Sequence, residues 1–346
     1  MMFQKTYKWL LGGLSALLTI AGAATIFAAA GTTRTTERPA SYAAAMIDLL
    51  SQIKAYAAAR QPEFEFIGNG AVGLLTSDGD LTVADRQRVL DSLDGIMAES
   101  LYYRWTADGF AETPSAEREP YLRALLAAKQ TSRQQEKPLT VLTLDYTDRD
   151  RAAEKARRRS RTNGFLPQIK AGRSLDRLNR SEDRMEHATG HSVTRLSEAG
   201  SFDILLNPGR YHTKQAYLDA LQHSDSDVLI IDAYFGGEML TKADVDSIKQ
   251  RRDGSQRLVF AYLSVGEAAS YRDYWHSVWA KQPPEWLEGP NADWPDSYRV
   301  RYWERGWQDI LYGRPDSQLD RIMGAGFSGA MLDTIDVYQY FSAQDF

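Results

Sequence analysis

Short apolar runs alternate along the chain with longer amphipathic or charged segments. Eight of the runs predict strands, namely Phe64–Ile67, Gly95–Ala98, Leu139–Leu144, Gly164–Lys170, Phe202–Leu206, Val228–Ile231, Leu258–Val265 and Phe327–Leu332. Helical spacing or dense charge marks Ser41–Arg60, Leu81–Leu93, Glu117–Lys129, Asp150–Arg161, Thr213–Gln222, Thr241–Arg252 and Trp303–Met323. Strands that alternate with helices in this way predict βα units and a parallel sheet.

A polar side chain stands at the end of most predicted strands. These residues are Asn69, Glu99, Asp145, Asn207, Asp232, Glu267 and Asp333. One such residue is only a turn signal. A ring of them matches a (β/α)8 barrel (TIM barrel), which builds its site at the carboxyl ends of its strands. A doubly wound sheet with a second domain is the structural alternative.

Two of these strand ends carry carboxylates in settings that suit catalysis. The last strand is followed by Asp333 and Asp336, which either serve chemistry at a strand end or cap the next helix. Glu99 stands between an apolar run and the aromatic residues Tyr102, Tyr103 and Trp105. Such surroundings raise the pKa of a carboxyl group by desolvation, as a general acid requires. The alternative for Glu99 is a solvated side chain at a helix start.

Composition narrows the class of protein. The chain has 346 residues, 43% of them apolar, with a net charge of −5 and no cysteine. This composition suits a globular protein with a sizeable core. It provides no basic surface for nucleic acid, mildly favours a cationic or neutral partner, and excludes disulfides and thiolate chemistry. No phosphate-binding loop, metal-ligand cluster or Ser-His-Asp arrangement is evident, so no cofactor is expected.

The N-terminus resembles an export signal. Lys5 and Lys8 precede an apolar run from Trp9 to Ala30 that ends in small residues. Residues 1–30 are therefore a cleaved signal peptide or an uncleaved membrane anchor, and residues 31–40 a linker. Either reading places the protein outside the cytoplasm: periplasmic, secreted or anchored facing outward.

Two further segments break the alternation. Arg173–Gly200 is charged and contains His187 and His191, but no HExxH pattern surrounds them, so we interpret it as a linker, with metal binding by the two histidines as the alternative. Pro283–Arg301 predicts a long aromatic loop, preceded by a helix that would carry Tyr271, Tyr274, Trp275 and Trp279.

Several blocks of sequence resemble one family. FDILLNPGRYHTKQAYLDAL, VLIIDAYFGG, RLVFAYLSVGEAASYRDYW, YRVRYW and GFSGAMLDTIDVYQYF resemble successive blocks of glycoside hydrolase family 114, the endo-α-1,4-polygalactosaminidase-like barrels. The earlier segments FEFIGNG, LDGIMAESLYY, VLTLDY and NGFLPQIK resemble the later strands of that family, although Gly68 stands where a glutamine is often expected.

The order of these blocks predicts a circular permutation. Residues 41–171 correspond to the second half of the family, residues 172–200 form a charged linker, and residues 201–346 correspond to the first half. We therefore expect a single barrel over residues 41–346 in which the helix Ser41–Arg60 follows Tyr340 in space. Barrels tolerate such rearrangement because their chain ends usually lie close together.

The resemblance implies an exported glycoside hydrolase that cleaves an α-1,4-linked galactosamine-containing polysaccharide, a cationic amino sugar polymer. It implies that Asp333 is the nucleophile or base and Glu99 the general acid, on strands two apart around the barrel. The implied substrate-binding residues are Asn69, Asp145, Asp232, Tyr234, Tyr262, Glu267, Asp336 and Tyr338, with Trp303 as a further sugar platform. For each aromatic residue taken singly, packing is the alternative.

Two other functions compete with hydrolysis. The same ring of acids would serve an envelope protein that binds a glycan without cleaving it. A lipid-anchored assembly factor has less support, because the chain has no lipobox cysteine.

Overall fold

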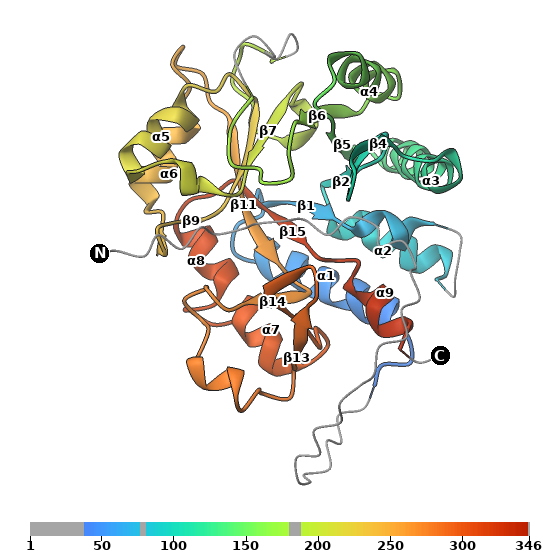
Figure 1. Ribbon diagram of the computed structural model, residues 1–346, viewed down its shortest axis with the longest axis vertical. Coiled ribbons are helices and arrows are strands. Elements are labelled where there is room, and N and C mark those ends of the chain that lie inside the picture. Colours follow the sequence, from blue (N-terminus) through green and yellow to red (C-terminus); the bar gives the residue numbers. More distant parts are fainter. Residues whose placement is uncertain (1–37, 77–80, 180–187, 345–346) are drawn as a thin grey trace.

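The computed structural model describes residues 38–76, 81–179 and 188–344. Its centre is an eight-stranded parallel sheet in the order β6-β5-β2-β1-β15-β11-β8-β7 (Figure 1). The strands are β1 (Glu65–Asn69), β2 (Gly95–Glu99), β5 (Thr140–Tyr146), β6 (Leu166–Lys170), β7 (Phe202–Leu205), β8 (Val228–Ile231), β11 (Leu258–Ser264) and β15 (Gly329–Asp333). All eight predicted strands are thus present, with boundaries that differ by a few residues.

The sheet curls into a nearly closed barrel whose seam lies between β6 and β7. No backbone ladder joins these two strands in the described parts of the chain, but side chains bridge them. The Gln168 amide donates to the Phe202 carbonyl at 2.9 Å and to Asp203 Oδ1 at 2.8 Å. The Lys170 ammonium pairs with the same buried carboxylate at 2.5 Å. The prediction of a (β/α)8 barrel is confirmed, rather than an open doubly wound sheet.

Helices surround the barrel on its outside (Figure 1). They are α1 (Tyr42–Ala58), α2 (Val83–Ser92), α3 (Ser115–Gln134), α4 (Asp150–Thr162), α5 (Lys214–Gln222), α6 (Lys242–Lys249), α7 (Arg305–Leu311), α8 (Gln318–Gly324) and α9 (Val337–Ser342). Thr82 and Thr241 begin α2 and α6 with complete capping boxes.

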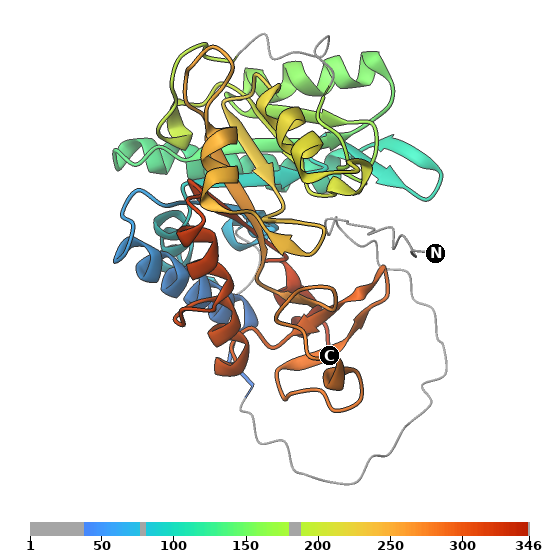
Figure 2. The same ribbon diagram turned by 90° about the vertical axis from the view of Figure 1, so that its left-hand side faces the viewer.

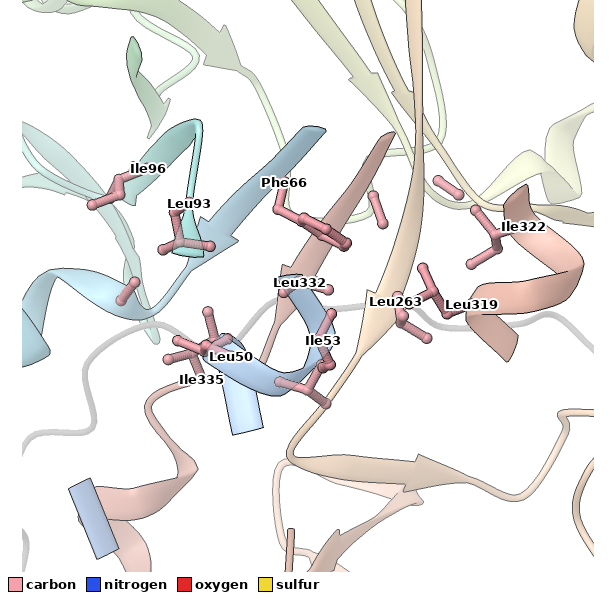
Figure 3. Close-up of a cluster of buried hydrophobic side chains, with 14 of the residues drawn as sticks. Leu50, Ile53, Phe66, Leu93, Ile96, Leu263, Leu319, Ile322, Leu332 and Ile335 are labelled. Carbon is pink, nitrogen blue, oxygen red and sulfur yellow. The ribbon is translucent and has the colours of Figure 1, made fainter. Parts of the chain in front are cut away.

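Apolar side chains form two layers on either side of the strands. The inner layer fills the barrel with residues such as Ile67, Met97 and Phe260. The outer layer packs strands against helices. Figure 3 shows part of it, with Leu50 and Ile53 of α1 near Phe66 of β1 and Leu332 of β15. Side chains alternate along a strand, so the inward series of β1, β2, β5 and β15 continue to Asn69, Glu99, Tyr146 and Asp333 at the mouth of the barrel.

The two ends of the described chain meet beside the barrel. The ring of Tyr42 in α1 stacks on Phe341 in α9 with centroids 5.6 Å apart, and the Tyr42 carbonyl accepts a 2.7 Å hydrogen bond from Tyr302. The expectation that the first helix follows Tyr340 in space is confirmed. Closure of any barrel brings its ends together, so this contact satisfies the permutation hypothesis without testing it alone.

Small antiparallel sheets beside the barrel were not predicted. They are β3 (Tyr103–Thr106) with β4 (Gly109–Glu112), β9 (Tyr234–Phe235) with β10 (Glu238–Met239), and β12 (Glu267–Ala269) with β14 (Trp294–Val300) and β13 (Leu287–Asn291). Figure 2 shows the β3–β4 hairpin in teal and the β13–β14 hairpin in orange projecting on the same side of the barrel.

Three element predictions were wrong. The segment 283–301 is largely the β13–β14 hairpin rather than a loop, and the aromatic run before it contains turns and the short η5 (Ser277–Ala280) rather than an α-helix. Its rings pack on the hairpin, as Trp275 does on Tyr298 with centroids 4.8 Å apart. The helix predicted over Trp303–Met323 is split into α7 and α8 because Gly313, at φ 96°, and Pro315 interrupt it.

Several predictions fall outside the described residues. These include the signal or anchor segment 1–30, residues 31–37 of the linker, and His187. Within the described ranges, the helices are all too short or too polar to span a bilayer. Those ranges also hold no group of three or more His, Cys, Asp or Glu side chains arranged for a metal ion.

Candidate active site

Three neighbouring strands bring two carboxylates and an amide together. Asp333 ends β15, Asn69 ends β1 and Glu99 ends β2, and β1 lies between the other two strands. The Asn69 side-chain nitrogen donates to Asp333 Oδ1 at 2.8 Å and to Glu99 Oε2 at 3.2 Å. These two oxygens are therefore at most about 6 Å apart, comparable with the separations of glycosidase carboxylate pairs.

The backbone after each of the three residues has the same unusual conformation. Gly70, Ser100 and Thr334 have φ values of 79°, 59° and 62°. The left-handed region is uncommon for residues other than glycine and is a marked outlier for β-branched threonine. Local strain of this kind clusters at functional sites, so the backbone marks these strand ends independently of their side chains.

Glu99 is set up as an acid. Burial, together with the negative charge of Asp333, raises the pKa of Glu99 to about 8, despite opposing hydrogen bonds from Tyr146 and Asn69. The Tyr146 hydroxyl donates to Glu99 Oε1 at 2.7 Å and fixes its orientation. Glu99 is therefore protonated at neutral pH and able to give up a proton, as the sequence suggested from its apolar and aromatic surroundings.

Asp333 is buried, with 2% of its surface exposed. Burial raises the pKa of its carboxyl group, and contacts with Asn69 and the Tyr262 hydroxyl oppose that rise. Its second oxygen, Oδ2, has no hydrogen-bond partner among the described residues. A buried carboxylate oxygen without a protein partner calls for an explanation, such as a bound water or a catalytic role, and Asp145 Oδ2 is in the same state.

A cavity of about 600 Å³ opens over this group. Six of the predicted site residues line it, namely Asn69, Glu99, Tyr234, Tyr262, Glu267 and Asp336. Asp333 is not itself a lining residue, but it contacts Asn69 and Tyr262, which are. The volume is in the range of small-molecule and cofactor sites.

Four predicted binding residues lie elsewhere. Asp145 accepts hydrogen bonds from the backbone nitrogens of Tyr102 and Tyr103 at 2.6 and 2.8 Å, and so holds the loop after β2. Asp232 forms a buried ion pair with Arg272 at 2.8 Å. Trp303 packs on Phe341 with ring centroids 4.9 Å apart, and Tyr338 is partly buried on α9. None of the four lines the cavity.

The two other acids of the cavity have different surroundings. Glu267 accepts a 2.8 Å hydrogen bond from the Asn291 side chain, and burial raises its pKa. Burial and the charge of Asp333 raise the pKa of Asp336 to about 7. Asp336 occupies the N-cap position of α9, but its side chain makes no capping hydrogen bond. The capping alternative raised by the sequence therefore does not account for this carboxylate.

Sequence reasoning missed Tyr146, which contacts Glu99, and the cavity residues Tyr121, Arg173, Tyr271, Trp294 and Arg299. Side-chain alternation was a usable signal for the first of these. Leu142 and Leu144 face the barrel interior, so Tyr146 must face inward and Asp145 outward. Tyr121 lies on α3, whose helix was predicted but not as part of the site, and the others lie on loops and hairpins whose course the sequence pattern did not predict.

Comparison with known proteins adds a second line of observation. Residues 182–346 match the model of glycoside-hydrolase family GH114. These residues supply β7, β8, β11 and β15, and with them Asp333. The chain is a GH114-like TIM barrel. The match supports membership of the general class of glycoside hydrolases, which the sequence blocks also predicted.

The GH114-like barrel is also similar to uncharacterized proteins of three organisms. It is 33% identical over 132 residues to one from Methanocaldococcus jannaschii, covering 38% of this chain and 37% of the relative. The identity is 36% over 126 residues with one from Deinococcus radiodurans, covering 36% and 38%, and 32% over 134 residues with one from Thermotoga maritima, covering 39% and 40%. The chain thus matches well under half the length of each relative.

Proposed function

We propose that the protein hydrolyses glycosidic bonds with Asp333 and Glu99 as its carboxyl pair. The observation that carries the proposal is the amide of Asn69, which holds both carboxylates from the strand between them. Hydrolysis of a glycoside needs two carboxyl groups that flank the scissile bond. The family match supports the same class of reaction.

The two carboxyl groups have different roles in this proposal. Glu99, protonated at neutral pH, gives its proton to the leaving-group oxygen as the bond to the anomeric carbon breaks. Asp333 then either attacks the anomeric carbon or removes a proton from the attacking water. The Asp333 carboxylate is buried, so the proposal requires substrate binding to expose its Oδ2, the oxygen without a hydrogen-bond partner among the described residues.

We propose that the substrate is a partly deacetylated α-1,4-linked galactosamine polymer and that the enzyme acts on it outside the cytoplasm. Glu267 and Asp336 provide carboxyl groups for ammonium or hydroxyl groups in the same cavity as Glu99. Tyr262 and Tyr234 provide ring surfaces there. This finer assignment rests on the sequence blocks and on the acids of the cavity.

The test is a screen of secreted polysaccharides for release of reducing ends by the wild-type protein. We expect release from polymers that contain α-1,4-linked galactosamine, and none from matched polymers that lack it. Release from an unrelated polysaccharide alone would overturn the substrate assignment and leave the hydrolase class in place.

Binding without cleavage is the second candidate, because acids in a cavity serve recognition as well as hydrolysis. It predicts saturable binding of the polymer, no new reducing ends, and equal binding by wild-type protein and Glu99→Gln. Calorimetric titration beside the reducing-end assay separates the two functions.

A further inference from the structure

The charges around the mouth of the barrel are arranged unevenly. Following the strand order from β11 through β15, β1, β2 and β5 to β6, the mouth carries in turn Glu267, Asp333, Asn69, Glu99, Tyr146 and Arg173. Asp336 follows Asp333 on the same arc. Along this order the acids and Arg173 lie on opposite sides of Glu99, and the β13–β14 hairpin connects the two, with Asn291 bonded to Glu267 and Trp294 against Arg173.

The guanidinium group of Arg173 is held between two aromatic rings, and no carboxylate neutralises its charge within the described residues. Its guanidinium carbon lies 4.6 Å from the ring centre of Trp105 in the β3–β4 hairpin and 5.0 Å from that of Trp294 in the β13–β14 hairpin. Within residues 38–76, 81–179 and 188–344 it has no ion-pair or hydrogen-bond partner. Contact with two rings restricts the guanidinium group while leaving its N–H groups available as donors.

The other arginines of the cavity have partners of their own. Arg118 pairs with Glu119 at 3.0 Å, and Arg272 pairs with Asp232 at 2.8 Å. Arg299 donates to the Asn291 side chain at 3.3 Å. Arg173 is therefore the cavity arginine best placed to bind a ligand.

We propose that Arg173, Trp105 and Trp294 form the leaving-group subsite, which takes a sugar that carries an oxygen acceptor and excludes a free ammonium group. This rests on the proposed function, in which Glu99 protonates the leaving group and so faces that sugar. The acceptor is an acyl carbonyl or a carboxylate, either of which accepts from the guanidinium N–H groups. An ammonium group at the same place meets a like charge.

The consequence is a preference about the order of sugars in the polymer. The acids beside Asp333 favour a free amine on the glycosyl side of the cleaved bond. Arg173 favours an N-acylated or acidic sugar on the leaving side. A partly deacetylated polymer is then cut where an acylated residue follows an unacylated one, rather than at random.

The test measures binding to Glu99→Gln protein, in which the amide mimics the protonated acid and no turnover complicates the measurement. The ligands are fully N-acetylated and fully deacetylated α-1,4-galactosamine oligomers and an α-1,4-galacturonate oligomer. Arg173→Gln should weaken binding of an acceptor-bearing oligomer by about tenfold or more, since a hydrogen bond to a charged group is lost. It should not weaken binding of the deacetylated oligomer.

Arg177→Gln is the matched control, because it removes the same charge from an exposed residue of the same segment whose partner is Asp176. It should change none of the three affinities. Loss confined to the acetylated oligomer assigns the acyl carbonyl, and loss confined to the galacturonate oligomer assigns the carboxylate. Equal effects of Arg173→Gln on all three ligands, no effect, or no measurable binding of any of them would overturn the subsite.

These outcomes are separate from the fate of the hydrolase proposal. An Arg173 effect in a protein that releases no reducing ends would leave a glycan-binding subsite and remove the catalytic function. Hydrolysis by the wild-type protein with unchanged binding after Arg173→Gln would keep the catalytic function and remove the Arg173 subsite.

Discussion

Asn69 is the residue on which the geometry of the candidate site depends. Its side-chain nitrogen contacts both carboxylates. The residue as a whole is only 2% exposed. The sequence placed it at a strand end but not between the two acids. The permutation hypothesis put the two acids on strands two apart, and the structure adds that β1 pairs with both β15 and β2 and that the Asn69 amide contacts both acids.

Asn69→Ala should lower kcat by about tenfold or more, since correct placement of catalytic groups contributes strongly to rate. The loss of both amide contacts also raises the pKa values of Glu99 and Asp333, because each contact lowers them. Initial rates of reducing-end release measure the effect. Asn163→Ala, at a side chain bonded to the Tyr102 hydroxyl away from the acids, is the control. Equal kcat values for the two variants would speak against a positioning role.

The Tyr146 hydroxyl lowers the pKa of Glu99, and the pH dependence of the rate can measure this effect. Its hydrogen bond lowers the pKa of Glu99, which burial raises to about 8. The protonated form of Glu99 is active, so activity falls as pH rises through that pKa. Tyr146→Phe removes the stabilising bond to the carboxylate and should move the alkaline limb of kcat/KM to higher pH. An unchanged or lowered limb would show that Glu99 is not the titrating acid.

At the scale of elements, strand and helix identity followed from local sequence more closely than loop structure did. The runs around Ile67, Met97 and Met331 are apolar on both faces, as buried parallel strands require. The hairpins β3–β4 and β13–β14 lack that signal, because their aromatic and charged residues pack against each other and against loops. Arg173 follows β6 and contacts both hairpins through Trp105 and Trp294, which is why the sequence did not identify it.

Strand β15 approaches its neighbours closely at Gly329, which pairs with Glu65 on one side and Phe260 on the other. A Cβ atom there would lie 2.2 Å from the Glu65 carbonyl oxygen and 2.4 Å from the Phe260 ring. Gly329→Ala should therefore destabilise the protein by about 1–3 kcal/mol or more. Urea unfolding measures the change in the free energy of unfolding.

Gly324→Ala is the control for that substitution. Gly324 ends α8, and a Cβ atom at this position would meet nothing within 4 Å. We expect it to leave the free energy of unfolding unchanged or to raise it by a few tenths of a kcal/mol. A stability loss as large as that of Gly329→Ala would contradict the packing argument.

At the scale of the whole molecule, the barrel places its chain ends and its seam at different points. The ends meet where α9 packs on α1, between β15 and β1. The seam lies between β6 and β7, where side chains replace backbone pairing. If the chain is a permuted form of the family barrel, the seam is where the unpermuted chain would begin and end.

A repermuted chain tests this interpretation. Joining the present ends by a flexible linker and opening the chain between Asn179 and Ala188 restores the family order. Because this opening breaks no pairing in the eight-stranded sheet, we expect a folded protein with circular dichroism and activity close to those of the parent. A second permutant opened between β15 and α9 should be much less stable, because it severs the chain beside Asp333. Equal loss of folding in both permutants would contradict the interpretation.

The most direct measurement is the rate of reducing-end release from partly deacetylated α-1,4-galactosamine polymer by wild-type protein, Asp333→Asn and Glu99→Gln. All three are first compared for folded state by circular dichroism. The account predicts turnover by the wild type and losses of about a thousandfold or more in each variant, since each removes a group required in the transition state. Wild-type rates retained in both variants would contradict the assignment of the carboxyl pair.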